Sequence, residues 1–287
     1  MAAPLVLGPL VVVAGSGRLP LLVADSLQRA GRAYRVLGLR GFTARGLRAD
    51  AVVGVLDVAG ALARLDAWRP AGVVLVGGVA RPGPSALIGA AALLRDRDSL
   101  RAVAAGDDGL LRRVVALIEA RGHPVVGVGA VAPDLLAPAG LLGRLPVPAE
   151  AEEALAVGRR LLAALAPFDL GQGAVIAGRR VLAVEGPEGT DRMLARAAPG
   201  PLAGLSDRLR GARRGGVLVK VAKRAQDRRV DLPAIGPRTV RRAARAGLTG
   251  IAVGAGSTLV LDRAETAALA DRLGLFLVGL PAEPEER

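Results

Sequence analysis

Short apolar runs bounded by glycines alternate with longer amphipathic segments through the first half of the chain. Apolar runs of about four to eight residues are typical of buried strands, and apolar residues recurring every three or four positions predict helices. Because the two kinds of segment alternate, we expect βαβ units and a mostly parallel, Rossmann-like sheet. The predicted strands are 10–14, 34–39, 51–55, 73–76 and 125–128. The predicted helices are one that follows the turn 15–20 and ends near Gly31, and the segments 57–68 and 108–121.

The second half opens with a different pattern. Two apolar segments, 174–177 and 181–185, are joined by Gly178-Arg179-Arg180, and a short connection containing glycine favours an antiparallel hairpin. We therefore predict an α/β domain with a mixed sheet. Its other expected strands begin at 217, 250, 258 and 275, and its expected helices are 149–166, 237–247 and 263–273.

Between the halves, residues 133–148 are rich in proline, alanine, glycine and leucine and show little periodicity, which is typical of a domain connection. At 287 residues and 52% hydrophobic, the chain can build two cores. The predicted divisions are an N-terminal domain over 1–135, a linker over 136–148, a C-terminal domain over 149–280 and a polar tail over 281–287.

Composition narrows the chemistry. The chain has no cysteine and one histidine, His123, which excludes disulfides, thiolate catalysis and sites with two imidazoles. A net charge of +13 indicates anionic partners, but the arginines are spread without a dense run and five aromatic residues are too few for base stacking. We expect phosphate-bearing small molecules or an anionic lipid surface, and no nucleic acid. The apolar start lacks a positive leader and is broken by proline, so we expect a cytoplasmic protein.

A glycine turn follows the first predicted strand, in the order Gly15-Ser16-Gly17-Arg18-Leu19-Pro20. Strand, glycine turn and helix together offer backbone N–H groups to a phosphate. Pro20 replaces the third glycine of the dinucleotide fingerprint, and 35–40 carries no acid, so a nicotinamide dinucleotide is not favoured. Gly15, Gly17 and Leu19 remain candidate substrate contacts.

Two further loops of the first half carry candidate contacts. Gly78 and Arg81 follow the strand 73–76, and ligands of parallel sheets gather beyond the carboxyl ends of the strands. Asp107 and Asp108 begin the helix 108–121. One aspartate suffices as a helix cap, so the other either interacts favourably with the helix dipole or contacts a ligand.

An acid-rich loop follows the predicted hairpin, in the order Glu185-Gly186-Pro187-Glu188-Gly189-Thr190-Asp191. Carboxylates on such a loop can bind a hard divalent cation, although acids also favour helix starts. Both interpretations stay open for Glu185 and Asp191. The neighbouring loop before the hairpin contributes Gln172 and Gly173.

The segment 215–237 contains the only two lysines, Lys220 and Lys223, and the other 37 of the 39 basic residues are arginine. A compact ammonium differs from a planar guanidinium as a phosphate ligand, although both lysines could be ordinary snorkelling residues. Strand alternation lets both serve one site only if the strand ends near Ala222. Gln226, Asp227 and Asp231 follow, and acids beside lysines suggest metal-assisted attack on a phosphoryl centre in a cleft between domains.

Several motifs occur in an order that resembles the LpxI family, the UDP-2,3-diacylglucosamine pyrophosphatases of Gram-negative lipid A synthesis. The resemblance spans about residues 10–280 and departs from the usual pattern at Ser16 and Arg224. The motifs are Gly15-Ser16-Gly17-Arg18-Leu19-Pro20, Gly106-Asp107-Asp108, Asp169-Leu170-Gly171-Gln172-Gly173, Glu185-Gly186-x-Glu188-Gly189-Thr190-Asp191, Gln226-Asp227-x-Arg229-Val230-Asp231-Leu232-Pro233 and Ala246-Gly247-Leu248-x-Gly250-Ile251.

The resemblance implies a cytoplasmic, Mg²⁺-dependent hydrolase that converts UDP-2,3-diacylglucosamine to 2,3-diacylglucosamine 1-phosphate (lipid X) and UMP. It implies two α/β domains with the substrate between them, transient contact with the inner leaflet, and an essential aspartate at Asp231 that holds the cation or activates water. A homodimer and a non-catalytic nucleotide-sugar-lipid binding protein stay open as alternatives. The candidate residues are Asp231, Asp227 and Lys223 for catalysis, Asp231, Asp191 and Glu185 for Mg²⁺, and Gly15, Gly17, Leu19, Gly78, Arg81, Asp107, Gln172, Gly173, Thr190, Asp191, Lys220 and Gln226 for substrate.

Overall fold

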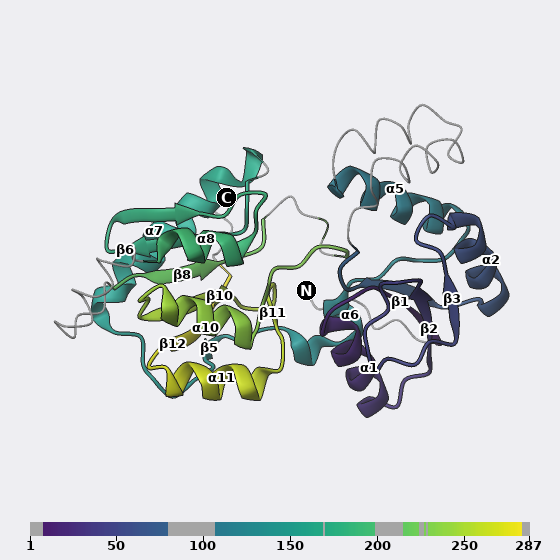
Figure 1. The fold of residues 1–287 in the computed structure, drawn as a ribbon, viewed down its shortest axis with the longest axis horizontal. Coiled ribbons are helices and arrows are strands. Elements are labelled where there is room, and N and C mark those ends of the chain that lie inside the picture. Colours follow the sequence, from purple (N-terminus) through teal and green to yellow (C-terminus); the bar gives the residue numbers. More distant parts are fainter. Residues whose placement is uncertain are drawn as a thin grey trace. The chain divides into compact units, whose positions relative to one another are not determined.

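The chain folds as two compact α/β units, Met1–Pro133 and Asp134–Arg287, in the computed structural model (Figure 1). The structure describes residues 8–79, 107–168, 170–198, 215–223, 227 and 229–282. Among these residues, no helix is both long enough and apolar enough to cross a bilayer.

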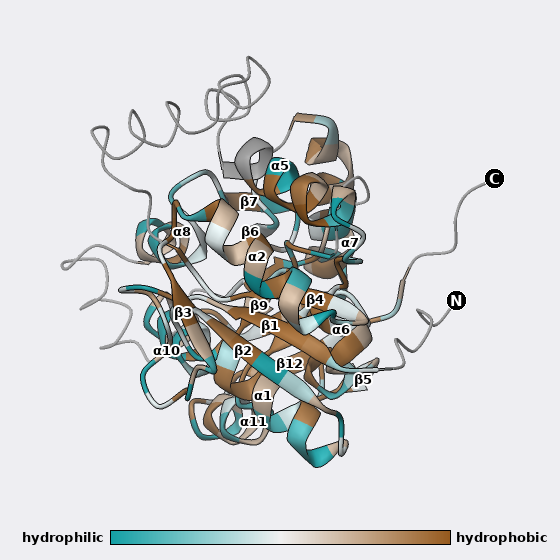
Figure 2. Ribbon diagram, turned by 90° about the vertical axis from the view of Figure 1, so that its right-hand side faces the viewer, coloured by the Kyte–Doolittle hydropathy of each residue, from teal (hydrophilic) through white to brown (hydrophobic). Residues whose placement is uncertain are grey.

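The first unit is built on a four-stranded sheet whose strands are all parallel, as predicted. Strand β1 is hydrophobic along its length (Figure 2), and both of its neighbours pair with it over all five of its residues. In the order β3-β2-β1-β4, β2 and β3 are added on one side of β1 and β4 on the other, so the strand order reverses between β1 and β4. The strands are β1 (Leu10–Ala14), β2 (Tyr34–Leu39), β3 (Ala51–Val53) and β4 (Gly72–Val76).

The described helices of this unit are α1 (Leu19–Arg29), α2 (Val58–Trp68), α5 (Asp107–Ala120) and α6 (Val128–Val131). Helix α2 begins where the Asp57 carboxylate accepts a hydrogen bond from the Gly60 N–H at 2.8 Å. The strand predicted at 125–128 is reduced to a bridge between Val125 and Val73. Val128 and Val131 are both buried, and their spacing of three residues fits one turn of helix.

The second unit contains a six-stranded mixed sheet, in the order β5-β12-β10-β8-β6-β7. Strands β8, β10 and β12 are parallel, and β6 is antiparallel both to β8 and to its hairpin partner β7. The strands are β5 (Gly140–Leu141), β6 (Gly173–Ala177), β7 (Arg180–Val184), β8 (Val217–Lys220), β10 (Gly250–Gly254) and β12 (Phe276–Leu280), with β9 (Ala234–Ile235) and β11 (Leu259–Val260) in a separate parallel pair.

Two apolar clusters form the core of this unit. Leu218 belongs to one and its neighbour Val219 to the other, because successive strand residues point to opposite faces of a sheet. A side chain at Gly158 of α7 would lie 2.6 Å from Val219, so this glycine permits close packing of the helix on the sheet. The helices are α7 (Ala149–Leu165), α8 (Thr190–Ala197), α10 (Pro237–Arg245) and α11 (Arg263–Arg272), with 3₁₀ turns at Pro133–Leu135 and Ala166–Phe168.

The segment 136–148, expected to be a linker, is hydrogen-bonded to the second unit. The Ala137 N–H donates to the Thr258 carbonyl at 2.8 Å, and β5 pairs antiparallel with β12. The proline- and glycine-rich composition therefore indicates an irregular path, and several backbone N–H groups along this path donate to residues of the second unit.

Candidate functional site

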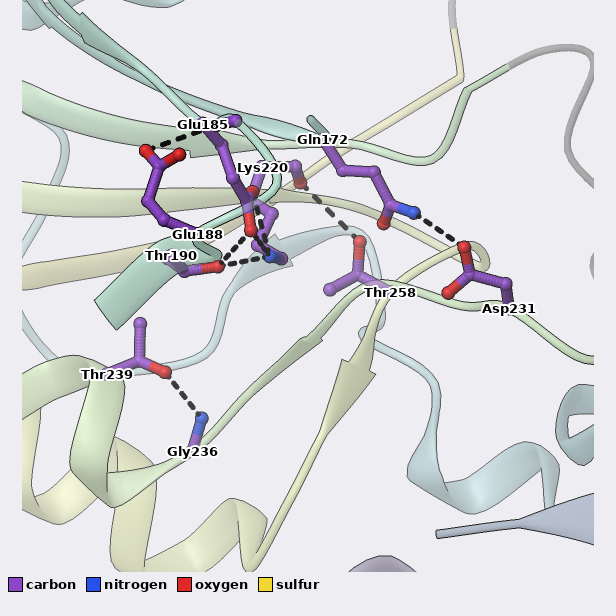
Figure 3. Close-up of polar contacts among 10 residues, drawn as sticks. Gln172, Glu185, Glu188, Thr190, Lys220, Asp231, Gly236, Thr239 and Thr258 are labelled. Carbon is purple, nitrogen blue, oxygen red and sulfur yellow. Dashed lines mark hydrogen bonds and ion pairs between the residues drawn. The ribbon is translucent and has the colours of Figure 1, made fainter. Parts of the chain in front are cut away.

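Three side chains meet at the end of β8 (Figure 3). The Lys220 ammonium lies 3.2 Å from the nearer oxygen of the Glu185 carboxylate and 2.5 Å from the Thr190 hydroxyl. Thr190 in turn donates to Glu185 at 2.7 Å. Lys220 and Glu185 are only 5% and 8% exposed, so each buried charge is balanced by the other.

This arrangement bears on three of the predicted site residues. Lys220 and Thr190, predicted to contact substrate, both contact Glu185, which was predicted to bind metal. Among the described residues, no three histidine, aspartate or glutamate side chains gather in a way that could hold a metal ion. The structure therefore does not bring Glu185, Asp191 and Asp231 together as one ligand set.

Asp191, in the first turn of α8, is directed to α10. Its carboxylate lies 2.7 Å from the Arg238 guanidinium and 3.1 Å from that of Arg242. Arg242 also donates to the Asp191 carbonyl at 3.3 Å. Two guanidinium groups thus neutralise this acid and join the two helices.

Glu188, between Glu185 and Thr190, stabilises the same loop. The pKa of its carboxyl is held below the usual value by its own backbone N–H first, and also by the Gly186 N–H and by Arg196. The Arg196 guanidinium lies 2.5 Å away, within α8. The loop between β7 and α8 is therefore fixed by its own acids.

The backbone of Glu185 also holds the segment Gly171-Gln172-Gly173. The Gly171 N–H donates to the Glu185 carbonyl at 2.9 Å, and the Glu185 N–H donates to the Gly173 carbonyl at 2.8 Å. A side chain at Gly171 would lie 2.3 Å from the Glu185 carbonyl oxygen, and one at Gly173 would lie 2.7 Å from its carboxylate. Gly171 is therefore required by the close approach of the Glu185 backbone, and a side chain at Gly173 would displace the Glu185 carboxylate.

Gln172 lies between these glycines and faces Asp231 (Figure 3). Its amide Nε2 donates to Asp231 Oδ2 at 3.1 Å, across 59 positions of sequence. Its carbonyl accepts a hydrogen bond from the Val221 N–H at 3.0 Å, just beyond β8. The structure thus brings together two of the predicted residues, Gln172 from the segment before β6 and Asp231 from the segment after β8.

Asp227 shapes the turn that presents Asp231. Its carbonyl accepts hydrogen bonds from the N–H groups of Val230 and Asp231, both at 3.1 Å. Its carboxylate accepts from the Arg229 N–H at 3.0 Å and pairs with the Arg229 guanidinium at 2.7 Å. These contacts give Asp227, predicted to be catalytic, a structural role in the turn 227–231.

The remaining predicted residues of this half are placed less fully. Strand β8 ends at Lys220, which meets the condition under which Lys220 and Lys223 could serve one site. Lys223 is half-buried in the irregular segment that follows. Gln226 and, in the first unit, Arg81 and the side chain of Asp107 lie outside the described residues.

In the first unit, the predicted glycine loops meet where the sheet order reverses. Ser16 and Gly78 exchange two backbone hydrogen bonds of 2.8 and 2.9 Å, and the Ser16 hydroxyl donates to the Gly78 carbonyl at 2.7 Å. A side chain at Gly15 would lie 2.7 Å from that carbonyl oxygen. Gly17 has a φ of +97° with open space around it, and α1 begins two residues later at Leu19.

Sequence reasoning missed Thr258, which is fully buried next to the backbone of Lys220. Its hydroxyl donates to the Lys220 carbonyl at 3.5 Å, and its own carbonyl accepts from the Ala137 N–H. Thr258 precedes β11 and carries no charge, so no local pattern distinguishes it from other strand threonines.

Comparisons with known proteins agree with this architecture. Residues 9–135 match the model of the LpxI N-terminal domain, and residues 138–278 match that of the LpxI C-terminal domain. The UDP-2,3-diacylglucosamine pyrophosphatase LpxI of Caulobacter vibrioides is 43% identical over 283 residues, which cover 96% of this chain and 98% of the relative. Two domain models in sequence and a full-length relative show that the chain belongs to the LpxI family.

Proposed function

We propose that the chain hydrolyses the pyrophosphate bond of UDP-2,3-diacylglucosamine and releases 2,3-diacylglucosamine 1-phosphate and UMP. The observation that carries the proposal is the end-to-end similarity to a pyrophosphatase of that name, at 43% identity. The contact between Gln172 and Asp231 adds support, because it places a carboxylate on a braced loop of the C-terminal unit.

The reaction is a hydrolysis of a phosphoric anhydride. A water oxygen forms a bond to one phosphorus, the bond from that phosphorus to the bridging oxygen breaks, and the water gives up its proton. Asp231 is the residue to which we assign the orientation of this water or the acceptance of its proton. It is only half-buried, so solvent can reach its loop.

Asp231 could bind Mg²⁺ as a single protein carboxylate that acts together with the substrate phosphates. Mg²⁺ is usually held by one or two carboxylates together with substrate phosphates and water, and it does not need a cage made of protein alone. Asp231 would hold the ion in that manner, since Glu185 and Asp191 are engaged by Lys220 and by two arginines. When bound, the ion would neutralise charge on the phosphates.

The glycine loops of the first unit are proposed to contact the nucleotide phosphates. They lie at the point between β1 and β4 where the strand order reverses, and open α/β sheets bind ligands outside the carboxyl ends of their strands at such points. Gly15, Gly17 and Gly78 are the described residues in these loops.

A lipid surface is the proposed partner of the loop that precedes Gln172. Phe168, one of three phenylalanines in the chain, is 73% exposed, and Leu170 is also exposed. Four residues of chain reach at most about 14 Å, so Phe168 lies near Gln172. An exposed aromatic residue near the site, in a chain of net charge +13, suits a substrate embedded in an anionic bilayer.

The test is incubation of the purified chain with UDP-2,3-diacylglucosamine and Mg²⁺ in H₂¹⁸O. We expect UMP and the lipid 1-phosphate in equal amounts, with one ¹⁸O in one of the two products. Tight association without turnover under any divalent cation would instead support a non-catalytic carrier of nucleotide-sugar lipids.

A further inference from the structure

We propose that Gln172 is a positioning residue for Asp231 and not a substrate contact. The proposal rests on the catalytic role assigned to Asp231 above. Its starting observation is the 3.1 Å hydrogen bond from the Gln172 amide to Asp231 Oδ2. An amide donor can fix the plane of a carboxylate without bringing a charge to the site.

The side chain of Gln172 projects from a rigid support. Gly171 and Gly173, on either side of it, are both hydrogen-bonded to the backbone of Glu185, and a side chain at Gly171 would collide with that backbone. The Gln172 carbonyl accepts the Val221 N–H, which anchors the same residue to the end of β8. A side chain on a support of this kind can hold its partner within a narrow range of positions.

Glu185 is itself held by Lys220 and Thr190. The contacts therefore run from the buried Lys220 through Glu185 and the backbone of the glycine segment to Gln172 and Asp231. Through this series of contacts, Lys220 would act on the reaction indirectly, by supporting Gln172. It also explains how a residue buried in an ion pair can lie in the same loop cluster as the proposed catalytic acid.

The turn 227–231 supplies the other half of the alignment. The Asp231 N–H donates to the Asp227 carbonyl, and the turn is closed by the contacts of the Asp227 carboxylate with Arg229. The backbone of Asp231 is thus set by its own turn, while Gln172 sets its carboxylate. Loss of the amide donor would remove this contact to the carboxylate and leave the backbone hydrogen bonds of the turn in place.

The test compares Gln172→Met, which keeps the length but cannot donate, with Gln172→Asn, which keeps the donor one methylene short. We expect kcat to fall about 10- to 100-fold in Gln172→Met, while KM and the Kd for the lipid nucleotide change less than about threefold. Gln172→Asn should recover part of kcat. In an Asp231→Asn background, Gln172→Met should leave the Kd unchanged.

Two results would overturn the inference. One is a tenfold rise in Kd on Gln172→Met with kcat preserved, which would make Gln172 a substrate contact. The other is wild-type kcat in Gln172→Met. An independent readout is the ¹⁵N–¹H resonance of the Gln172 side-chain amide, which should shift on Asp231→Asn even without substrate. If Asp231→Asn turns over normally, the assigned role of Asp231 fails while that shift still reports whether the contact exists.

Discussion

The ammonium of Lys220 lies 3.2 Å from the carboxylate of Glu185, and both groups are almost fully removed from solvent. The pair connects β8 to the loop that follows β7, and the backbone of Glu185 holds the glycines around Gln172. A buried pair of this kind is costly to break from one side, because the remaining charge stays buried without its partner.

Lys220→Met should therefore destabilise the second unit strongly, by about 3–5 kcal/mol. Lys220→Met combined with Glu185→Leu should recover much of that loss, since no unpaired charge remains. Urea unfolding at pH 7 measures both. The control is Arg241→Met, which breaks an exposed pair with Glu265 at 3.4 Å and should cost less than about 1 kcal/mol. Equal losses for the single and double variants at Lys220 would contradict this assignment.

Gly15→Ala should disrupt the meeting of the glycine loops, because its Cβ would lie 2.7 Å from the Gly78 carbonyl oxygen. Gly78→Ala is the matched control, since its Cβ would meet only the Ser16 hydroxyl oxygen at 3.4 Å. We expect a lower melting temperature for Gly15→Ala and a near wild-type melting temperature for Gly78→Ala. Indistinguishable variants would show that close packing of these loops is not needed.

The first unit carries an acid-sensitive contact between α2 and the loop after α5. His123 Nε2 lies 2.9 Å from the Asp66 carboxylate, and Arg121 lies 2.7 Å from it. The hydrogen bond with His123, and then the charge of Arg121, hold the pKa of Asp66 below 3.8. Because the folded-state pKa is lowered, this stabilisation is present above about pH 4 and is lost as the pH falls through the folded value.

Asp66→Asn should accordingly melt at a lower temperature than the wild type at pH 7, and the difference should narrow below about pH 4. Melting curves between pH 2.5 and 7 measure this, with Asp25→Asn, an exposed acid of α1, as the control for net charge. A difference that stays constant down to pH 2.5 would show that the ionised carboxylate does not stabilise the fold.

Phe168→Ser should weaken binding to vesicles that contain anionic lipid, because it removes an exposed aromatic side chain near the site. Flotation with vesicles of mixed neutral and anionic phospholipid measures the bound fraction. Turnover of substrate dispersed in detergent should change little. The control is Leu273→Ser, which changes an exposed apolar residue at the end of α11. An unchanged bound fraction for Phe168→Ser would contradict the proposal that this loop contacts the lipid surface.

Most of the fold follows from local patterns in the sequence. The periodicity predicts β1, β2 and the hairpin of β6 and β7 within a residue or two, because each is a short apolar run bounded by glycine or polar residues, even though β7 exposes Val181 and Leu182. It fails at 125–128, where only Val125 pairs with the sheet and α6 already begins at Val128. It also misses the pairing of β5 with β12, which joins residues about 137 positions apart.

The candidate site was predictable as a list of residues but not as a set of contacts. Acids, lysines and glycines in order nominated Glu185, Lys220, Gln172 and Asp231. Only the folded chain shows that Glu185 is used by Lys220 and that Gln172 faces Asp231, since those pairs are separated by 35 and 59 positions. Local spacing carries no information about partners so far apart.

The most direct test of the account is single-turnover release of UMP by Asp231→Asn beside Asp227→Asn, with UDP-2,3-diacylglucosamine and Mg²⁺. We expect Asp231→Asn to lose at least about 10³-fold in rate with an unchanged melting temperature. Asp227→Asn keeps an oxygen that can accept the Arg229 N–H, so it should retain activity within about tenfold. Wild-type turnover by a folded Asp231→Asn variant would contradict the central claim that Asp231 is the acid of the reaction.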